Sequence, residues 1–236
     1  MLKTIEQKKL YIIFDDSLID ENIERCFEPE YWKTANKVVG SAAGRGTTWF
    51  VQLCNIQGAL RHYRRGGLFG KLISDHYFFT DWQKTRSIAE FNLLNVLKKH
   101  NVNVPKPIAA KVIKHNFCYQ ADLLSQKIPN AKDLVDILQQ RKLTAAEYSS
   151  IAKQIKKMHQ AQVNHTDLNI HNILLDGDGE AWIIDFDKCY QQVGEYWKDA
   201  NLQRLLRSFK KELMKRQIKW SDNDWTILVN AYHFNI

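Results

Sequence analysis

Short apolar runs dominate the first half of the chain, whereas helical periodicity dominates the second half. The runs predict strands at residues 10–14, on both sides of a loop of small residues at 40–46, and at residues 108–113 and 117–124. Apolar residues that recur three and four positions apart predict helices at residues 81–99, 131–140, 144–162 and 196–219, and a last helix follows Trp220. No repeat or linker divides the sequence, so the pattern predicts an α+β protein whose first part is rich in strands.

Two of the predicted helices carry further sequence signals: one has a capping box, and the other has an apolar and a basic face. Thr144 and Glu147 have the spacing of a capping box, which starts a helix. In helix 196–219 the apolar residues share one face and basic residues fill much of the remainder. This helix can pack its apolar face on the protein and leave its charges in solvent, or its basic face can contact anionic membrane lipid.

The stretch from 163 to 187 holds the candidate chemistry. Asp167 lies in a polar loop, Asn172 opens an apolar run, and a second apolar run ends on Asp185. The Asp/Gly turn at 176–179 predicts a hairpin that brings Asn172 and Asp185 together. A carboxylate and a carboxamide suit a hard cation such as Mg²⁺, and Asp167 is placed to accept a proton from a hydroxyl group. The layout predicts a phosphoryl-transfer site, and the alternative is a solvated loop and turn.

Composition and charge limit the classes of partner that the protein can have, but they do not identify one partner. The 236 residues are 44% hydrophobic and 25% charged, which is ordinary for a soluble globular protein. A net charge of +8 favours an acidic partner, such as phosphorylated lipid, a membrane surface or nucleic acid. No nucleic-acid-binding motif accompanies this charge, so nucleic acid is not expected as a partner.

The sequence shows neither a targeting signal nor two closely spaced cysteines. No apolar run reaches the roughly 20 residues of a membrane span, and the first residues lack a signal-peptide core. The cysteines are scattered without a Cys-x-x-Cys pair, at Cys26, Cys54, Cys118 and Cys189. They are expected to be reduced thiols of a cytosolic protein rather than zinc ligands.

The spacing of the central residues resembles the catalytic core of the protein kinases. That core has a His-Arg-Asp loop, an Asn five residues after the Asp, and an Asp-Phe-Gly segment further on. The matching residues here are His165, Asp167, Asn172, Asp185 and Phe186. Thr166 and Asp187 depart from the Arg and Gly of the pattern, and the missing Arg removes the usual docking point for a phosphorylated activation loop.

The resemblance implies a protein-kinase-like, two-lobed fold. A β-rich N-lobe would span residues 1–124, and a truncated helical C-lobe would span residues 125–236. The resemblance further implies ATP and Mg²⁺ as cofactors, with Asp167 as the catalytic residue and with Asn172 and Asp185 as metal ligands.

The same resemblance implies an ATP-binding set in the first half of the chain. Arg61 takes the place of the lysine that contacts the α- and β-phosphates, and Glu90 would pair with it. The alternative is that Glu90 is an ordinary surface residue, and the motifs downstream favour the pairing with Arg61. Gly44 and Gly46 would cover the phosphates, although a plain hairpin turn accounts for these glycines equally well.

The whole chain resembles the 3-deoxy-D-manno-octulosonic acid (Kdo) kinase family of lipopolysaccharide core biosynthesis. The runs that carry this resemblance are residues 60–67, Glu90, residues 121–124, residues 165–172 and residues 184–187. The Arg-His-Tyr-Arg-Arg-Gly-Gly run is the most family-specific of them. The resemblance implies transfer of the ATP γ-phosphate to the 4-hydroxyl of Kdo on the lipid A precursor. A peripheral protein at the cytoplasmic face of the bacterial inner membrane would carry out this reaction.

Two rival interpretations remain. One is a heptose kinase or another small-molecule kinase of the same fold, and the other is a non-catalytic kinase-like module that binds anionic lipid. Asn169 stands where protein kinases place a lysine beside the γ-phosphate. Arg64 or Arg65 would then supply the missing positive charge and contact the anionic substrate, unless they belong to a solvated basic loop.

Overall fold

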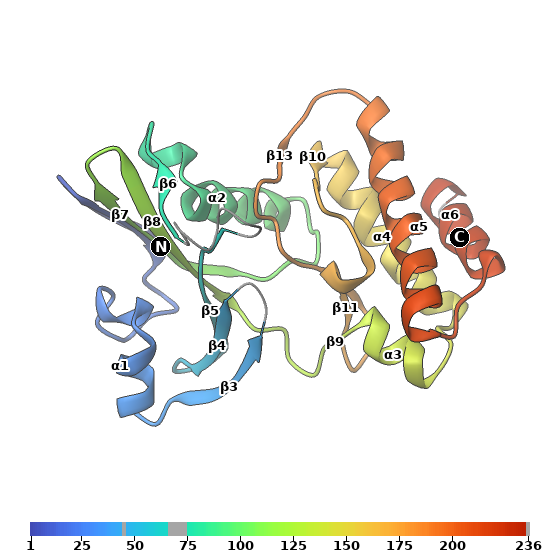
Figure 1. Ribbon diagram of the computed structural model, residues 1–236, viewed down its shortest axis with the longest axis horizontal. Helices are drawn as coiled ribbons and strands as arrows, with labels where there is room; N and C mark the ends of the chain where they lie inside the picture. Colours follow the sequence, from blue (N-terminus) through green and yellow to red (C-terminus); the bar gives the residue numbers. More distant parts are fainter. Residues whose placement is uncertain (44–45, 66–74, 235–236) are drawn as a thin grey trace. The chain divides into compact units, whose positions relative to one another are not determined.

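The computed structural model describes residues 1–43, 46–65 and 75–234, and the chain divides into two compact units (Figure 1). Unit 1 comprises Met1–Asn92 and Lys106–Lys127, and unit 2 comprises Leu93–Pro105 and Ile128–Ile236. The predicted α+β fold class, with a strand-rich first part and a helical second part, is confirmed. The predicted lobes at 1–124 and 125–236, with the roles assigned to them, stay a prediction.

Unit 1 is built on an antiparallel sheet of eight strands. In spatial order the main strands are β1 (Leu2–Gln7), β2 (Leu10–Asp15), β7 (Pro107–His115), β8 (Cys118–Gln126), β5 (Gln57–His62), β4 (Thr47–Gln52) and β3 (Val38–Ala43). The short strand β6 (Tyr77–Phe78) pairs with β8. Tight turns join β1 to β2 and β7 to β8, so both hairpins end at the sheet margin.

The two faces of this sheet carry different side chains. Leu60 and Leu124 lie opposite each other on β5 and β8, in a buried cluster with Trp32 beneath the segments η1 (Arg25–Phe27) and α1 (Pro29–Thr34). Because side chains alternate along a strand, Arg61 points to the other face. There its guanidinium meets Glu90 of helix α2 (Arg86–Lys99). The sheet therefore presents an arginine on the face that α2 covers.

Helix α2 is shorter than the predicted helix 81–99. The first residues instead form the 3-10 turn η3 (Trp82–Lys84), in which the Asp81 side chain accepts a hydrogen bond from the backbone of Gln83. Thr85 then adopts an extended conformation, with φ −70° and ψ 148°, before α2 begins. An Asx-type turn at Asp81 competes with the helix start at this point, and the periodic pattern alone does not reveal it.

Unit 2 holds most of the helical residues. In its second segment, from Ile128 onwards, the helices are α3 (Leu134–Gln140), α4 (Ala145–Gln160), α5 (Tyr196–Arg216) and α6 (Asp222–Phe234). Its short strands are β9 (Lys132–Asp133), β10 (Val163–Asn164), β11 (Ile173–Leu175), β12 (Ala181–Ile183) and β13 (Tyr190–Gln191). The predicted capping box at the start of α4 is confirmed, with Thr144 and Glu147 bonded reciprocally.

The long helix α5 packs its apolar face inside unit 2. Leu202, Leu205 and Phe209 are buried, whereas the basic residues Arg207 and Lys211 are exposed. Contact of that basic face with a membrane stays a prediction. Among the described residues, no helix has both the length and the apolar character needed to cross a bilayer.

His159 is buried where α4, α5 and α6 meet. Its Nδ1 lies 2.8 Å from the Tyr232 hydroxyl, and its ring packs edge-on against Trp197 and Tyr232 at 5.2 and 5.6 Å. Burial lowers the pKa of His159 to about 4, so the folded protein holds this imidazole neutral at neutral pH.

We expect the free energy of unfolding to fall as the pH drops from 6.5 towards about 4. The unfolded chain takes up a proton on His159 at the ordinary pKa, whereas the folded protein does so only near the lowered one. The difference between the two pKa values of His159 corresponds to at most roughly 3 kcal/mol of unfolding free energy. Urea unfolding across this pH range measures the slope. His159→Gln should make the slope shallower, and the exposed His100→Gln should not; equal slopes in the two variants would contradict the assignment.

Candidate active site

The predicted hairpin around the central acids is present in unit 2. Ile173 of β11 lies opposite Ile183 of β12, and the Ile184 amide donates to the Asn172 carbonyl at 3.0 Å. Asn172 and Asp185 therefore flank the same end of one antiparallel hairpin. The structure brings these two residues together as the sequence predicts.

The loop before β11 is pinned by its own amide side chains. Asn172 Nδ2 and Asn169 Nδ2 both donate to the backbone carbonyl of Asp167, at 3.0 and 2.9 Å. Asn169 Oδ1 accepts in turn from the His171 amide at 2.9 Å. With its backbone fixed in this way, Asp167 holds its carboxylate exposed on the surface of unit 2.

His165 connects this loop to the segment that carries Asp185. Its Nε2 donates to the Ile184 carbonyl at 3.0 Å, and its Nδ1 accepts from the Asp167 amide at 3.3 Å. The ring packs against Phe186 at 4.9 Å. Complete burial lowers the pKa of His165, so the imidazole stays neutral and keeps one donor and one acceptor nitrogen. A single side chain thus fixes the spacing of the Asp167 and Asp185 backbones.

Two polar side chains of α5 hold the other side of the loop. Asn201 Oδ1 accepts from the His165 amide at 3.2 Å, and Ser208 Oγ accepts from the Ile170 amide at 3.0 Å. The sequence analysis missed both residues. They are seven positions apart and so share one helix face, and polar residues among the apolar ones of that face are the signal that could have revealed them.

The donor set at the end of the hairpin fits a magnesium ion. Asn172 uses its amide nitrogen on the Asp167 carbonyl, which leaves its amide oxygen to accept a cation. Asp185 has φ 62°, a conformation that non-glycine residues rarely adopt and that often occurs at functional sites. One carboxylate and one carboxamide, completed by water and phosphate oxygens, form a common Mg²⁺ shell. In the described part of the chain, no group of three or more His, Cys, Asp or Glu side chains could hold a metal.

A second polar constellation lies within unit 1. Arg61 Nη2 donates to Glu90 Oε1 at 2.6 Å, which realises the predicted pairing. The Tyr63 hydroxyl donates to the other oxygen, Glu90 Oε2, at 2.5 Å, and the Arg61 guanidinium lies over the Tyr63 ring at 5.2 Å. Glu90 is only 4% exposed, so two donors fix a carboxylate that would be costly to bury alone. Sequence analysis missed Tyr63, although it stands two positions after Arg61 and on the same face.

Tyr63→Phe should therefore lower the free energy of unfolding by about 2 kcal/mol, because a buried carboxylate loses a hydrogen bond. Urea unfolding at neutral pH measures the change. Tyr190→Phe is the matched control, since Tyr190 is 50% exposed, and it should leave the unfolding midpoint unchanged. Equal midpoints for Tyr63→Phe and the wild type would show that the hydroxyl does not stabilise Glu90.

Two of the runs that carry the family resemblance meet across neighbouring strands. His62 on β5 lies opposite Asp122 on β8, and its Nδ1 lies 2.7 Å from Asp122 Oδ1 while its Nε2 lies 3.1 Å from Asp75. The hydrogen bond to Asp122 raises the pKa of His62. Residues 60–65, the described part of the first run, are thus linked to residues 121–124 by a partly buried polar pair.

Three of the remaining predicted residues, Gly46, Arg64 and Arg65, are described by the structure. Gly46 lies beside Arg64, and a Cβ built on Gly46 would approach Arg64 Cδ to 3.0 Å. Arg65 Nε donates to the His76 carbonyl at 2.8 Å, and its guanidinium lies over Tyr77 at 5.0 Å. Gly44 lies outside the described residues. A larger residue at position 46 would therefore displace the flexible Arg64 side chain by a few tenths of an ångström.

Comparisons with known proteins identify the family. The model of the lipopolysaccharide kinase (Kdo/WaaP) family matches residues 29–232. The chain is 58% identical over 233 residues to the 3-deoxy-D-manno-octulosonic acid kinase of Vibrio cholerae serotype O1, covering 99% of each chain. It is 44% identical over 236 residues to the enzyme of that name from Haemophilus influenzae, covering 97% of this chain and 98% of the other.

Among solved structures, the Cydia pomonella granulovirus kinase PK-1 matches with a TM-score of 0.46 at 13% identity, covering 71% of this chain and 59% of that one. The family assignment rests on the family model and on the near-full-length relatives, and it does not use this solved structure. The chain belongs to the lipopolysaccharide kinase (Kdo/WaaP) family.

Proposed function

We propose that this protein transfers the γ-phosphoryl group of ATP to the 4-hydroxyl of Kdo on the lipid A precursor. The observation that carries the proposal is the hairpin that gathers Asp167, Asn172 and Asp185, in a chain 58% identical to a Kdo kinase over 99% of its length. The reaction would take place at the cytoplasmic face of the bacterial inner membrane, where a basic chain of net charge +8 is attracted to anionic lipid.

Asp167 would act as the catalytic base. The 4-hydroxyl oxygen attacks the γ-phosphorus, the bond from that phosphorus to the ADP oxygen breaks, and Asp167 accepts the hydroxyl proton. Positioning matters more than base strength in such a reaction. The two amide side chains that fix the Asp167 carbonyl and the His165 contact to its amide supply that positioning.

The other predicted residues would bind the nucleotide and its charge. Asn172 and Asp185 would hold Mg²⁺, which supplies positive charge to the phosphates when bound. Arg61, held by Glu90, would contact the α- and β-phosphates as a planar fork rather than as a point charge. The backbone at Gly44 and Gly46 would approach the phosphates.

Arg64 and Arg65 are proposed to bind the anionic acceptor. The acceptor carries lipid phosphates and a sugar carboxylate, so it needs cationic partners. Both arginines are exposed. If Arg64→Ala and Arg65→Ala left turnover and acceptor affinity unchanged, this role would be wrong.

The test is a direct assay. Purified protein, ATP and Mg²⁺ are combined with a Kdo-bearing lipid A precursor, and the product is analysed by mass spectrometry and by fragmentation that locates the phosphate. We expect one added phosphate, on the 4-hydroxyl of Kdo, and no product without Mg²⁺. Phosphate on a heptose would support a heptose kinase instead, and no ATP consumption with any acceptor would support the non-catalytic lipid-binding module.

A further inference from the structure

One margin of the unit 1 sheet gathers the β1–β2 turn, the β7–β8 turn and the end of β6. The β1–β2 turn at Lys8 and Lys9 lies beside the β7–β8 hairpin, since the Lys114 amide donates to the Lys9 carbonyl at 2.8 Å. On the other side of β8, the Phe79 amide donates to the Phe117 carbonyl at 2.9 Å. Figure 1 shows these hairpin ends at the same extremity of the sheet. We call this margin, made of Lys8, Lys9, Lys114, Phe117 and Phe78, the hairpin rim.

The hairpin rim combines exposed aromatic rings with positive charge. Phe78 is 72% exposed and Phe117 is 82% exposed, although Phe117 occupies a tight turn where a small polar residue is the usual choice. Lys8 and Lys9 are also exposed. Within the described residues, none of the three rim lysines forms a salt bridge with a carboxylate. Exposed phenylalanines beside lysines that have no carboxylate partner are typical of a surface that binds a membrane or another molecule.

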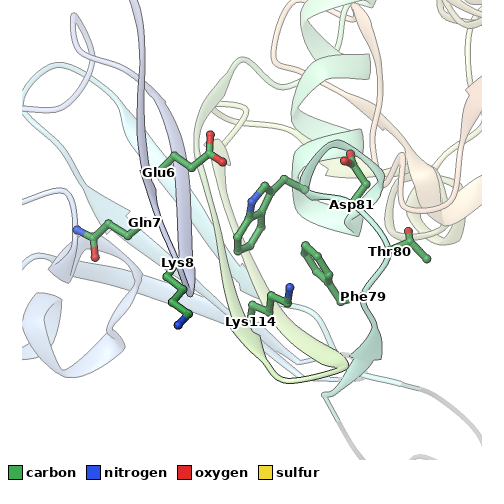
Figure 2. A pocket seen from close by; sticks show the side chains of 8 residues that line it. Glu6, Gln7, Lys8, Phe79, Thr80, Asp81 and Lys114 are labelled. Atoms are coloured by element: carbon green, nitrogen blue, oxygen red, sulfur yellow. The ribbon is translucent and has the colours of Figure 1, made fainter.

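A hollow of about 510 Å³ adjoins the rim (Figure 2) and shares Lys8 and Lys114 with it. Lys8 and Lys114 line it together with Phe79, whose ring centroid is 4.2 Å from Lys114 Nζ. In the view of Figure 2 the two lysines lie on one side of the hollow, and the carboxylates of Glu6 and Asp81 lie on the other. The two acids therefore lie apart from the two lysines in this view, and neither forms a salt bridge with them among the described residues.

We propose that the hairpin rim is a membrane-contact surface for anionic phospholipid. The lysines would be attracted to lipid phosphates, and Phe78 and Phe117 would enter the interface between headgroups and acyl chains. Such a combination of charge and apolar insertion is what reversible peripheral binding requires. The inference deepens the proposed function, and it rests on that function for its biological purpose, because a lipid-anchored acceptor is met at such a surface.

The rim differs from the basic face of α5, the other candidate for membrane contact. The α5 face also exposes Met214, at 86%, but Lys210 on that helix pairs with Asp222 at 3.4 Å, and the apolar face of the helix is buried in unit 2. The rim exposes two large aromatic rings next to its charges, which an amphipathic membrane contact needs. The observations therefore favour the rim.

The test uses the full chain and vesicles without acceptor. Sedimentation compares vesicles of equal parts phosphatidylglycerol and phosphatidylethanolamine with vesicles of phosphatidylcholine. We expect binding to the anionic vesicles only, weaker in high salt, and about tenfold weaker for Phe78→Ser/Phe117→Ser and for Lys8→Gln/Lys9→Gln. As a direct readout, Phe117→Trp should shift its fluorescence to the blue on the vesicles, whereas Val193→Trp, at a position 89% exposed in unit 2, should not.

Three results would overturn the proposal: unchanged binding in the rim variants, loss of binding only in Arg207→Gln/Lys211→Gln of α5, or a rim-dependent dimer in solution without vesicles. Turnover on a deacylated, lipid-free acceptor separates this inference from the proposed function. Rim variants should keep wild-type turnover there. If the wild type phosphorylates no Kdo-bearing acceptor, the proposed function fails while the vesicle result still decides the rim.

Discussion

Asp167→Asn is expected to lower kcat for phosphoryl transfer about 10³-fold, within the range that general-base residues contribute. The asparagine keeps the shape of the side chain but cannot accept the hydroxyl proton. The loop should survive the change, because its hydrogen bonds use the Asp167 backbone carbonyl and amide rather than the carboxylate. The Km for ATP should therefore change little. Rates of ADP release with the Kdo-bearing acceptor measure the effect.

Asp178→Asn provides a matched control. Asp178 is an exposed carboxylate in the turn of the same hairpin, and its backbone amide bonds to Asp176. The substitution makes the same chemical change beyond the other end of the strands and should leave kcat unchanged. A kcat within a few-fold of wild type for Asp167→Asn would remove Asp167 from the catalytic role, because positioning groups alone would then account for the rate.

Local signals predicted much of the fold correctly. The capping box at Thr144 and Glu147 is a contact between residues three positions apart, so the sequence contains both partners in one window. The hairpin that joins Asn172 to Asp185 is likewise local, because an Asp/Gly turn determines its register. Helix 81–99 is the counterexample, where a side-chain turn at Asp81 replaces the first helical turn.

The residues that sequence analysis missed are those whose partners are distant in sequence. Tyr63 reaches Glu90 across 27 positions, and Asn201 reaches the backbone of His165 across 36 positions. No local pattern encodes these pairs, because they exist only once α2 covers the sheet face and α5 lies beside the loop. The sequence therefore predicts which residue types perform the chemistry, and the tertiary structure adds the side chains that hold them in place.

Asp185→Asn should abolish most turnover, again by about 10³-fold, and should raise the Mg²⁺ concentration needed for half-maximal activity. The carboxylate is the one charged ligand in the proposed pair, since Asn172 contributes only an amide oxygen. Asparagine tolerates the left-handed conformation that Asp185 adopts at φ 62°, so the variant should fold with an unchanged melting temperature. Turnover measured across a Mg²⁺ titration separates a lost ligand from a lost fold.

Lys188→Asn is the control for backbone conformation in that experiment. Lys188 also lies in the left-handed region, with φ 63°, three residues after Asp185, and it is exposed. The same asparagine in the same conformation should leave the Mg²⁺ dependence unaltered, because no metal ligand is removed. If Asp185→Asn instead kept wild-type turnover at every Mg²⁺ concentration, the end of the hairpin would not be the metal site. The left-handed conformation of Asp185 would then serve only the turn that follows β12.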